Sequence, residues 1–129
     1  MGGMVLEGIV TSGFGKGAIF MSIDYYKEKI KEKLGFDPYP GTLNLKVDKE
    51  QTNLLKGIDS IRIESFEKDG KNFGGASCYK ARINNINGSI IVPDLTENEE
   101  DMIEVIASVN LKSKLGITDG DNVKIQLEN

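Results

Sequence analysis

Residues 40–47 read Pro-Gly-Thr-Leu-Asn-Leu-Lys-Val, a turn followed by an uninterrupted alternation of apolar and polar side chains. Successive side chains of a β-strand point to opposite faces, so the alternation predicts a strand with Leu43, Leu45 and Val47 on one face. The other face then carries Thr42, Asn44 and Lys46. We expect the apolar face to lie in the core of the fold.

Strand patterns rich in β-branched and apolar side chains lie on both sides of this stretch. They cover residues 4–11, 61–66, 73–83, 89–92, 102–107 and 122–127, with a turn at Asp69-Gly70. Helix and strand do not alternate along the chain as a series of βαβ units requires. The sequence therefore predicts a mainly β fold, a small closed or nearly closed barrel of mainly antiparallel strands.

Two helices are expected at the edge of this barrel. Residues 24–34 place apolar side chains three to four positions apart, which is typical of an amphipathic helix. Asp24 is the candidate N-cap of this helix, and Gly35 is a candidate C-terminal stop. A short helix is predicted over residues 111–115, ended by Gly116.

The chain has 129 residues, a size that fits one domain over residues 1–129. It holds one cysteine, Cys78, expected to be a partly buried strand residue, and no histidine. This composition excludes an internal disulfide, a cysteine-based metal cluster and any mechanism that needs a histidine of this chain. The net charge of −4 argues against a broad nucleic-acid interface. No apolar run approaches a membrane span, so we expect a cytoplasmic protein without membrane anchor or signal peptide.

Residues 12–20, Ser-Gly-Phe-Gly-Lys-Gly-Ala-Ile-Phe, place a glycine at every second position from 13 to 17. Glycine permits positive φ and close approach, and backbone N–H groups turned one way form a concavity that suits phosphate. A glycine-rich hairpin or β-bulge without a ligand explains the same pattern. The spacing matches neither the P-loop nor the dinucleotide fingerprint, so a nucleotide held here would be held on another fold.

Two further candidates carry oxygen ligands. Thr42 and Asn44 share one face of one strand, where a hydroxyl and an amide oxygen could supply two ligands to a hard cation such as Mg²⁺. These ligands are neutral and would need substrate phosphates beside them, and an ordinary solvent-facing strand edge also explains the pair. Glu104 lies among apolar neighbours, so its carboxylate either faces solvent or has a partner.

Together, these motifs resemble those of the archaeal CTP-dependent riboflavin kinases over nearly the whole chain. The resemblance rests on residues 12–17, 34–45, 91–96, 103–107 and 119–121. Its strongest single piece is the Pro-Gly-Thr-Leu-Asn-Leu block at residues 40–45. The resemblance implies a cradle-loop β-barrel that transfers the γ-phosphate of CTP to the ribityl 5′-hydroxyl of riboflavin and gives FMN and CDP.

Carried over residue by residue, the resemblance also implies a set of site residues and Mg²⁺ as the cofactor. The nucleotide phosphates would be wrapped by Gly13, Phe14, Gly15, Lys16, Gly17 and Ala18, with Lys16 as the nearest cation. The nucleotide would lie along Val109, Asn110, Leu111 and Lys112. Mg²⁺ would be held by Thr42 and Asn44, and the flavin would be contacted by Thr96 and Glu104. No general base is identified.

Two other classes of protein stay open on the residues themselves. A flavin-binding barrel that stores FMN would use Thr96 and Glu104 but not Thr42 and Asn44. The ending at residues 111–125, a short helix, a turn and a last strand, also occurs in swapped-hairpin transcription factors, which bind DNA as dimers. The acidic balance and the glycine-rich segment argue against DNA. We therefore expect CTP or CDP and riboflavin or FMN as partners, and no fused DNA-binding segment. The residues leave the oligomeric state open, and a monomer is one of the options.

Overall fold

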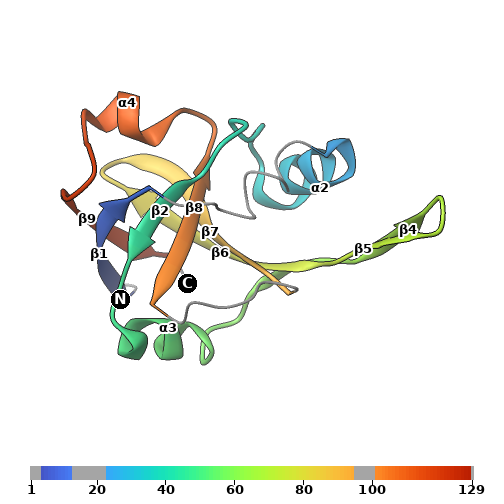
Figure 1. Ribbon diagram of the computed structural model, residues 1–129, viewed down its shortest axis with the longest axis horizontal. Helices are drawn as coiled ribbons and strands as arrows, with labels where there is room; N and C mark the ends of the chain where they lie inside the picture. Colours follow the sequence, from blue (N-terminus) through green and yellow to red (C-terminus); the bar gives the residue numbers. More distant parts are fainter. Residues whose placement is uncertain (1–3, 13–22, 95–100, 129) are drawn as a thin grey trace.

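The computed structural model describes residues 4–12, 23–94 and 101–128 (Figure 1). Its strands are β1 Val5–Thr11, β2 Leu43–Lys46, β3 Ile61–Ile63, β4 Phe66–Lys68, β5 Lys71–Phe73, β6 Ala76–Ile83, β7 Ile86–Pro93, β8 Met102–Ala107 and β9 Asn122–Leu127. Its helices are α2 Asp24–Leu34, α3 Lys49–Leu55 and α4 Leu111–Leu115. No helix in these three ranges is long and apolar enough to cross a membrane.

Strands β6, β7, β8, β2, β1 and β9 form a barrel in that order, and β9 pairs back onto β6 to close it. All of these pairings are antiparallel. The closing seam is short, with Ala81 opposite Leu127 and Arg82 opposite Gln126. β3 pairs with the other half of the same edge of β6. The predicted closed barrel of mainly antiparallel strands is confirmed.

Alternate side chains of the strands fill the barrel, as the two-residue period of a strand requires. The three apolar side chains that the sequence places on the buried face of β2 all lie in this core: Leu43, Leu45 and Val47. On the outer face Thr42 and Asn44 are half-buried, and Lys46 is exposed. The alternation in residues 42–47 therefore predicted the orientation of β2 correctly.

A second apolar cluster lies outside the barrel, where α2 covers the wall (Figure 1). The predicted apolar stripe of α2 is confirmed by the buried residues Tyr26, Ile30 and Leu34. They pack in one cluster with Ile63, Ala76, Cys78, Ile91 and Ile106. Cys78 is wholly buried there, more than expected, and burial raises the pKa of its thiol to about 12. The thiol is therefore a protonated part of the packing.

The bounds of α2 are the predicted ones, but its N-cap is not Asp24. The N-cap position is Ile23, which has extended backbone angles and no side-chain acceptor. Asp24 is the first helical residue, where its carboxylate faces the positive end of the helix dipole and lies 3.8 Å from Lys27 Nζ. Gly35 has a φ of 84° and ends the helix as predicted.

Two predicted strands are interrupted in the structure. Residues 61–66 divide between β3 and β4, and residues 73–83 divide between β5 and β6. A Cβ at Gly75 would lie 2.4 Å from the carbonyl oxygen of Ile63, so the close approach at the second break requires glycine. β4 and β5 form a hairpin that projects from the barrel (Figure 1), and its turn at Asp69-Gly70 is the predicted one.

The helix α3 was not predicted. Its Leu55 is buried, and its Gln51 forms two hydrogen bonds with the backbone of Glu7 in β1. The backbone N–H of Glu7 donates to Gln51 Oε1 at 2.7 Å, and Gln51 Nε2 donates to the carbonyl oxygen of Glu7 at 2.9 Å. β1 pairs with β2 only from Ile9 onward. The Gln51 carboxamide therefore takes the place of a partner strand at Glu7, two residues earlier.

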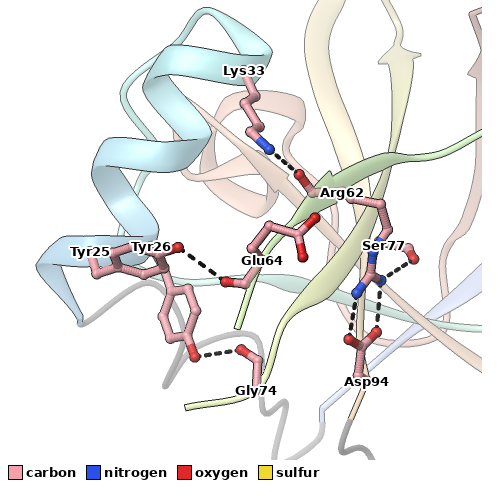
Figure 2. Close-up of polar contacts among 8 residues, drawn as sticks. All are labelled: Tyr25, Tyr26, Lys33, Arg62, Glu64, Gly74, Ser77 and Asp94. Carbon is pink, nitrogen blue, oxygen red and sulfur yellow. Dashed lines mark hydrogen bonds and ion pairs between the residues drawn. The ribbon is translucent and has the colours of Figure 1, made fainter. Parts of the chain in front are cut away.

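A polar cluster on the outside of the barrel is centred on Arg62 of β3 (Figure 2). The Arg62 guanidinium donates two hydrogen bonds to the carboxylate of Asp94, at 2.8 and 2.6 Å, and one to Ser77 Oγ at 2.7 Å. Hydrogen bonding from Arg62 lowers the pKa of the Asp94 carboxyl. Because Asp94 follows β7 directly, these contacts fix the end of β7 to β3 and β6.

Candidate functional site

Strands β2 and β8 are neighbours in the barrel wall, and their register places Asn44 opposite Glu104. The Thr42 hydroxyl donates a hydrogen bond of 2.9 Å to Glu104 Oε1. These side chains lie on the outer face, because the alternating residues Leu43 and Val105 fill the interior. The two predicted metal ligands and one predicted flavin contact therefore meet at one place on the wall.

The oxygen atoms of this group fit a hard cation. The Thr42 hydroxyl directs its proton at Glu104, which leaves lone-pair capacity on the Thr42 oxygen. The Glu104 carboxylate adds negative charge beside two ligands that are themselves neutral. Mg²⁺ commonly takes few protein oxygens, several waters and the phosphate oxygens of a substrate. The group therefore suits a cation that arrives with a phosphorylated ligand.

A cavity of about 280 Å³ opens beside Thr42. One side is lined by the chain that leads into β2: Tyr39, Pro40, Gly41, Thr42 and Leu43. Another side is lined by the predicted nucleotide segment: Val109, Asn110, Leu111 and Lys112. Val105 and Ala107 of β8 complete the lining. One cavity thus joins a predicted metal ligand to the four predicted nucleotide-binding residues 109–112.

The side chains of Asn110 and Lys112 are engaged within the protein. Asn110 is the N-cap of α4, and its Oδ1 accepts a hydrogen bond of 3.2 Å from the backbone N–H of Ser113. Lys112 Nζ lies 2.9 Å from a carboxylate oxygen of Asp119. The predicted bounds of α4 and its end at Gly116, where φ is 65°, are confirmed.

The remaining predicted site residues lie outside the described residues: Gly13, Phe14, Gly15, Lys16, Gly17, Ala18 and Thr96. Ser12, which directly precedes the first of them, donates a hydrogen bond from its hydroxyl to Asp119. Hydrogen bonds from Ser12 and from Lys112 lower the pKa of the Asp119 carboxyl. Asp119 therefore connects the chain that enters the glycine-rich segment with the nucleotide segment.

Two features of the site were missed by the sequence analysis. One is Tyr39, whose hydroxyl accepts a hydrogen bond of 3.2 Å from Asn110 Nδ2. The signal for Tyr39 was an aromatic residue between two prolines, directly before the block that carries Thr42. The other is the bond between Thr42 and Glu104, which are 62 positions apart and meet only through strand pairing.

The chain is similar to known proteins over nearly its whole length. A family model named CTP-dep_RFKase, described as "Domain of unknown function DUF120", matches residues 10–127. A riboflavin kinase of Archaeoglobus fulgidus is 41% identical over 98% of this chain and 55% of the relative. Riboflavin kinases of Methanoregula boonei and Pyrobaculum aerophilum are 42% and 40% identical, over 98% and 95% of this chain and 58% and 60% of the relatives. The chain thus spans little more than half the length of these curated relatives.

Proposed function

The chain belongs to the family that the CTP-dep_RFKase model represents, and on this premise we propose that it is the catalytic barrel of a CTP-dependent riboflavin kinase. The γ-phosphoryl group of CTP leaves the oxygen that bridges it to the β-phosphate. It forms a new bond with the ribityl 5′-oxygen of riboflavin, and the proton of that hydroxyl is released to solvent. The products are FMN and CDP.

The observation that supports this proposal most directly is the contact between Thr42 and Glu104. A kinase must bring the phosphates of one substrate to the hydroxyl of the other, because transfer depends on positioning. The residue proposed to ligate the metal of the nucleotide and a residue proposed to contact the flavin are joined here by a hydrogen bond of 2.9 Å. A module that only stores flavin has no need for this proximity.

The residues divide the work between binding and orientation. Thr42 and Asn44 would hold Mg²⁺, which when bound neutralises phosphate charge. Glu104 accepts a hydrogen bond from the Thr42 hydroxyl and so orients the Thr42 oxygen, and it would contact the flavin from the same face. Backbone N–H groups of residues 13–18 would surround the phosphates, with Lys16 as an added cation.

The base of the nucleotide would lie in the cavity beside residues 109–112. The side chains of Asn110 and Lys112 are committed to Ser113, Tyr39 and Asp119, which favours backbone groups for reading the cytosine. A base other than cytosine would leave these backbone groups without a hydrogen-bond partner, at a cost of ~1–3 kcal/mol for each group. We therefore expect CTP to be a better phosphate donor than ATP.

Incubation of the purified chain with riboflavin, Mg²⁺ and each nucleoside triphosphate, followed by chromatography for FMN, tests this function. We expect FMN in the presence of CTP, less with ATP, and none without a triphosphate. Absence of FMN with every triphosphate would overturn the kinase. Flavin binding that persists without turnover, and is unaffected by Thr42→Ala and Asn44→Ala, would favour the storage module.

A further inference from the structure

We propose that Tyr39 forms part of the nucleobase site, with its aromatic ring as a contact surface for the base. The proposal rests on the function proposed above, because it assumes that the cavity beside residues 109–112 receives a nucleotide. It adds to that site a residue that contributes affinity for the base.

Tyr39 is one of the few large apolar residues that remain exposed in the described part of the chain. It is 38% exposed, and it lines the same cavity as Thr42 and residues 109–112. A base in this cavity would have the proposed metal ligand near its phosphates and residues 109–112 beside its ring. Tyr39 is linked to both regions, because its backbone bonds to Gly41, which directly precedes Thr42, and its hydroxyl bonds to Asn110.

The Tyr39 side chain is held in place before any ligand arrives. Its hydroxyl accepts from Asn110 Nδ2 at 3.2 Å, and its backbone N–H donates to the carbonyl oxygen of Ala107 at 2.7 Å. The backbone N–H of Gly41 donates to the carbonyl oxygen of Tyr39 at 2.8 Å. A Cβ at position 41 would lie 3.2 Å from Cε2 of the Tyr39 ring, so glycine allows the ring to lie close over this turn.

A fixed and exposed ring in such a cavity suits a base for two reasons. It loses little conformational freedom on binding, because its position is already set by Asn110 and Gly41. Its π-face can stack on a base, and it does so for any base, because every base has a π-face. Tyr39 therefore contributes affinity, while the choice of cytosine falls to polar groups along residues 109–112.

The test compares CDP affinity by calorimetry for the wild type, Tyr39→Phe, Tyr39→Leu and Tyr39→Ala, with riboflavin affinity from flavin fluorescence as the internal control. We expect Tyr39→Phe to bind CDP nearly as the wild type, because the ring is retained. Tyr39→Leu and Tyr39→Ala should weaken CDP binding about tenfold or more, as loss of one base-aromatic stack does. Riboflavin affinity and Tm should be retained in Tyr39→Leu, which keeps an apolar side chain over Gly41.

The outcomes separate this inference from the kinase itself. CDP affinity in Tyr39→Leu and Tyr39→Ala equal to that of the wild type would overturn the role of Tyr39, while FMN formation by the wild type would still stand. Equal losses in Tyr39→Phe and Tyr39→Ala would assign the effect to the hydroxyl and Asn110, and would also overturn a contact by the ring. A wild-type chain that makes no FMN and binds no CDP would overturn both proposals.

Discussion

Replacement of Glu104 by glutamine separates the charge of this side chain from its shape. Glutamine keeps an oxygen that can accept a hydrogen bond from the Thr42 hydroxyl, so the bond of 2.9 Å can re-form. Glutamine lacks the negative charge of Glu104, so a hydrogen bond from a flavin N–H would no longer be charge-assisted. A hydrogen bond to a charged group is worth roughly 1.5–3 kcal/mol and a neutral one about 0.5–1.5 kcal/mol. We therefore expect riboflavin affinity to fall by about 1.4 kcal/mol, which is about tenfold in Kd.

Quenching of flavin fluorescence measures the Kd of riboflavin and FMN, and calorimetry without Mg²⁺ measures CDP affinity in the same variant. We expect CDP affinity to be nearly unchanged. Glu7→Gln is the matched control, because Glu7 is exposed on β1 and its contacts with Gln51 use the backbone. Unchanged flavin affinity in Glu104→Gln would refute the flavin contact. Loss of both affinities with a lowered Tm would show that Glu104 serves the barrel wall instead.

Three further changes test other parts of the site and the fold. Asn44→Ala should lower kcat about tenfold or more, with little change in Tm and partial recovery at higher Mg²⁺, since each ~1.4 kcal/mol is a factor of ten in rate. Full activity of both Asn44→Ala and Thr42→Ala at limiting Mg²⁺ would place the metal elsewhere. Gly15→Val adds a branched side chain where phosphate is proposed to approach, so calorimetry should show weaker CDP binding without a comparable loss for riboflavin. Normal CDP binding would leave the glycines with a structural role alone. Arg62→Met removes the ion pair between Arg62 and Asp94. Both side chains are 41% exposed, so solvent screening of their charges limits the loss of stability to about 1 kcal/mol or less. Because Arg62 holds the pKa of Asp94 below 3.8, this stabilisation is complete above pH 3.8 and is lost as the pH falls through the lowered pKa. Unfolding curves of wild type and variant at neutral and at strongly acidic pH measure it, and a difference that does not shrink in acid would contradict this account.

The parts of the fold predicted best from the sequence are those fixed by local patterns. The bounds of α2, α4, β8 and β9 follow from apolar periodicity and from glycines that end the helices. The helix α3 depends instead on contacts far along the chain, because Gln51 bonds to the backbone 44 positions away. The break before β6 has the same origin, since Gly75 is required by the nearby carbonyl of Ile63.

The site was predicted residue by residue but not as a group. Strand period placed Thr42 and Asn44 on one face, and the structure confirms that face. Period alone does not say which strand lies alongside, so the pairing of Asn44 with Glu104 had to come from the fold. Tyr39 belongs to a loop, where no periodicity marks a side chain as exposed or buried.

The short pairing between β6 and β9 determines where the barrel opens locally with the least loss of hydrogen bonds. Few ladder hydrogen bonds must break where Ala81 and Arg82 meet β9, so amide exchange by local opening should begin at this seam. The strands β2 and β8, which carry the site, are each paired on both sides and are separated from the seam by β1 and β7. The wall can therefore open along one line while the oxygens of Thr42, Asn44 and Glu104 keep their relative positions.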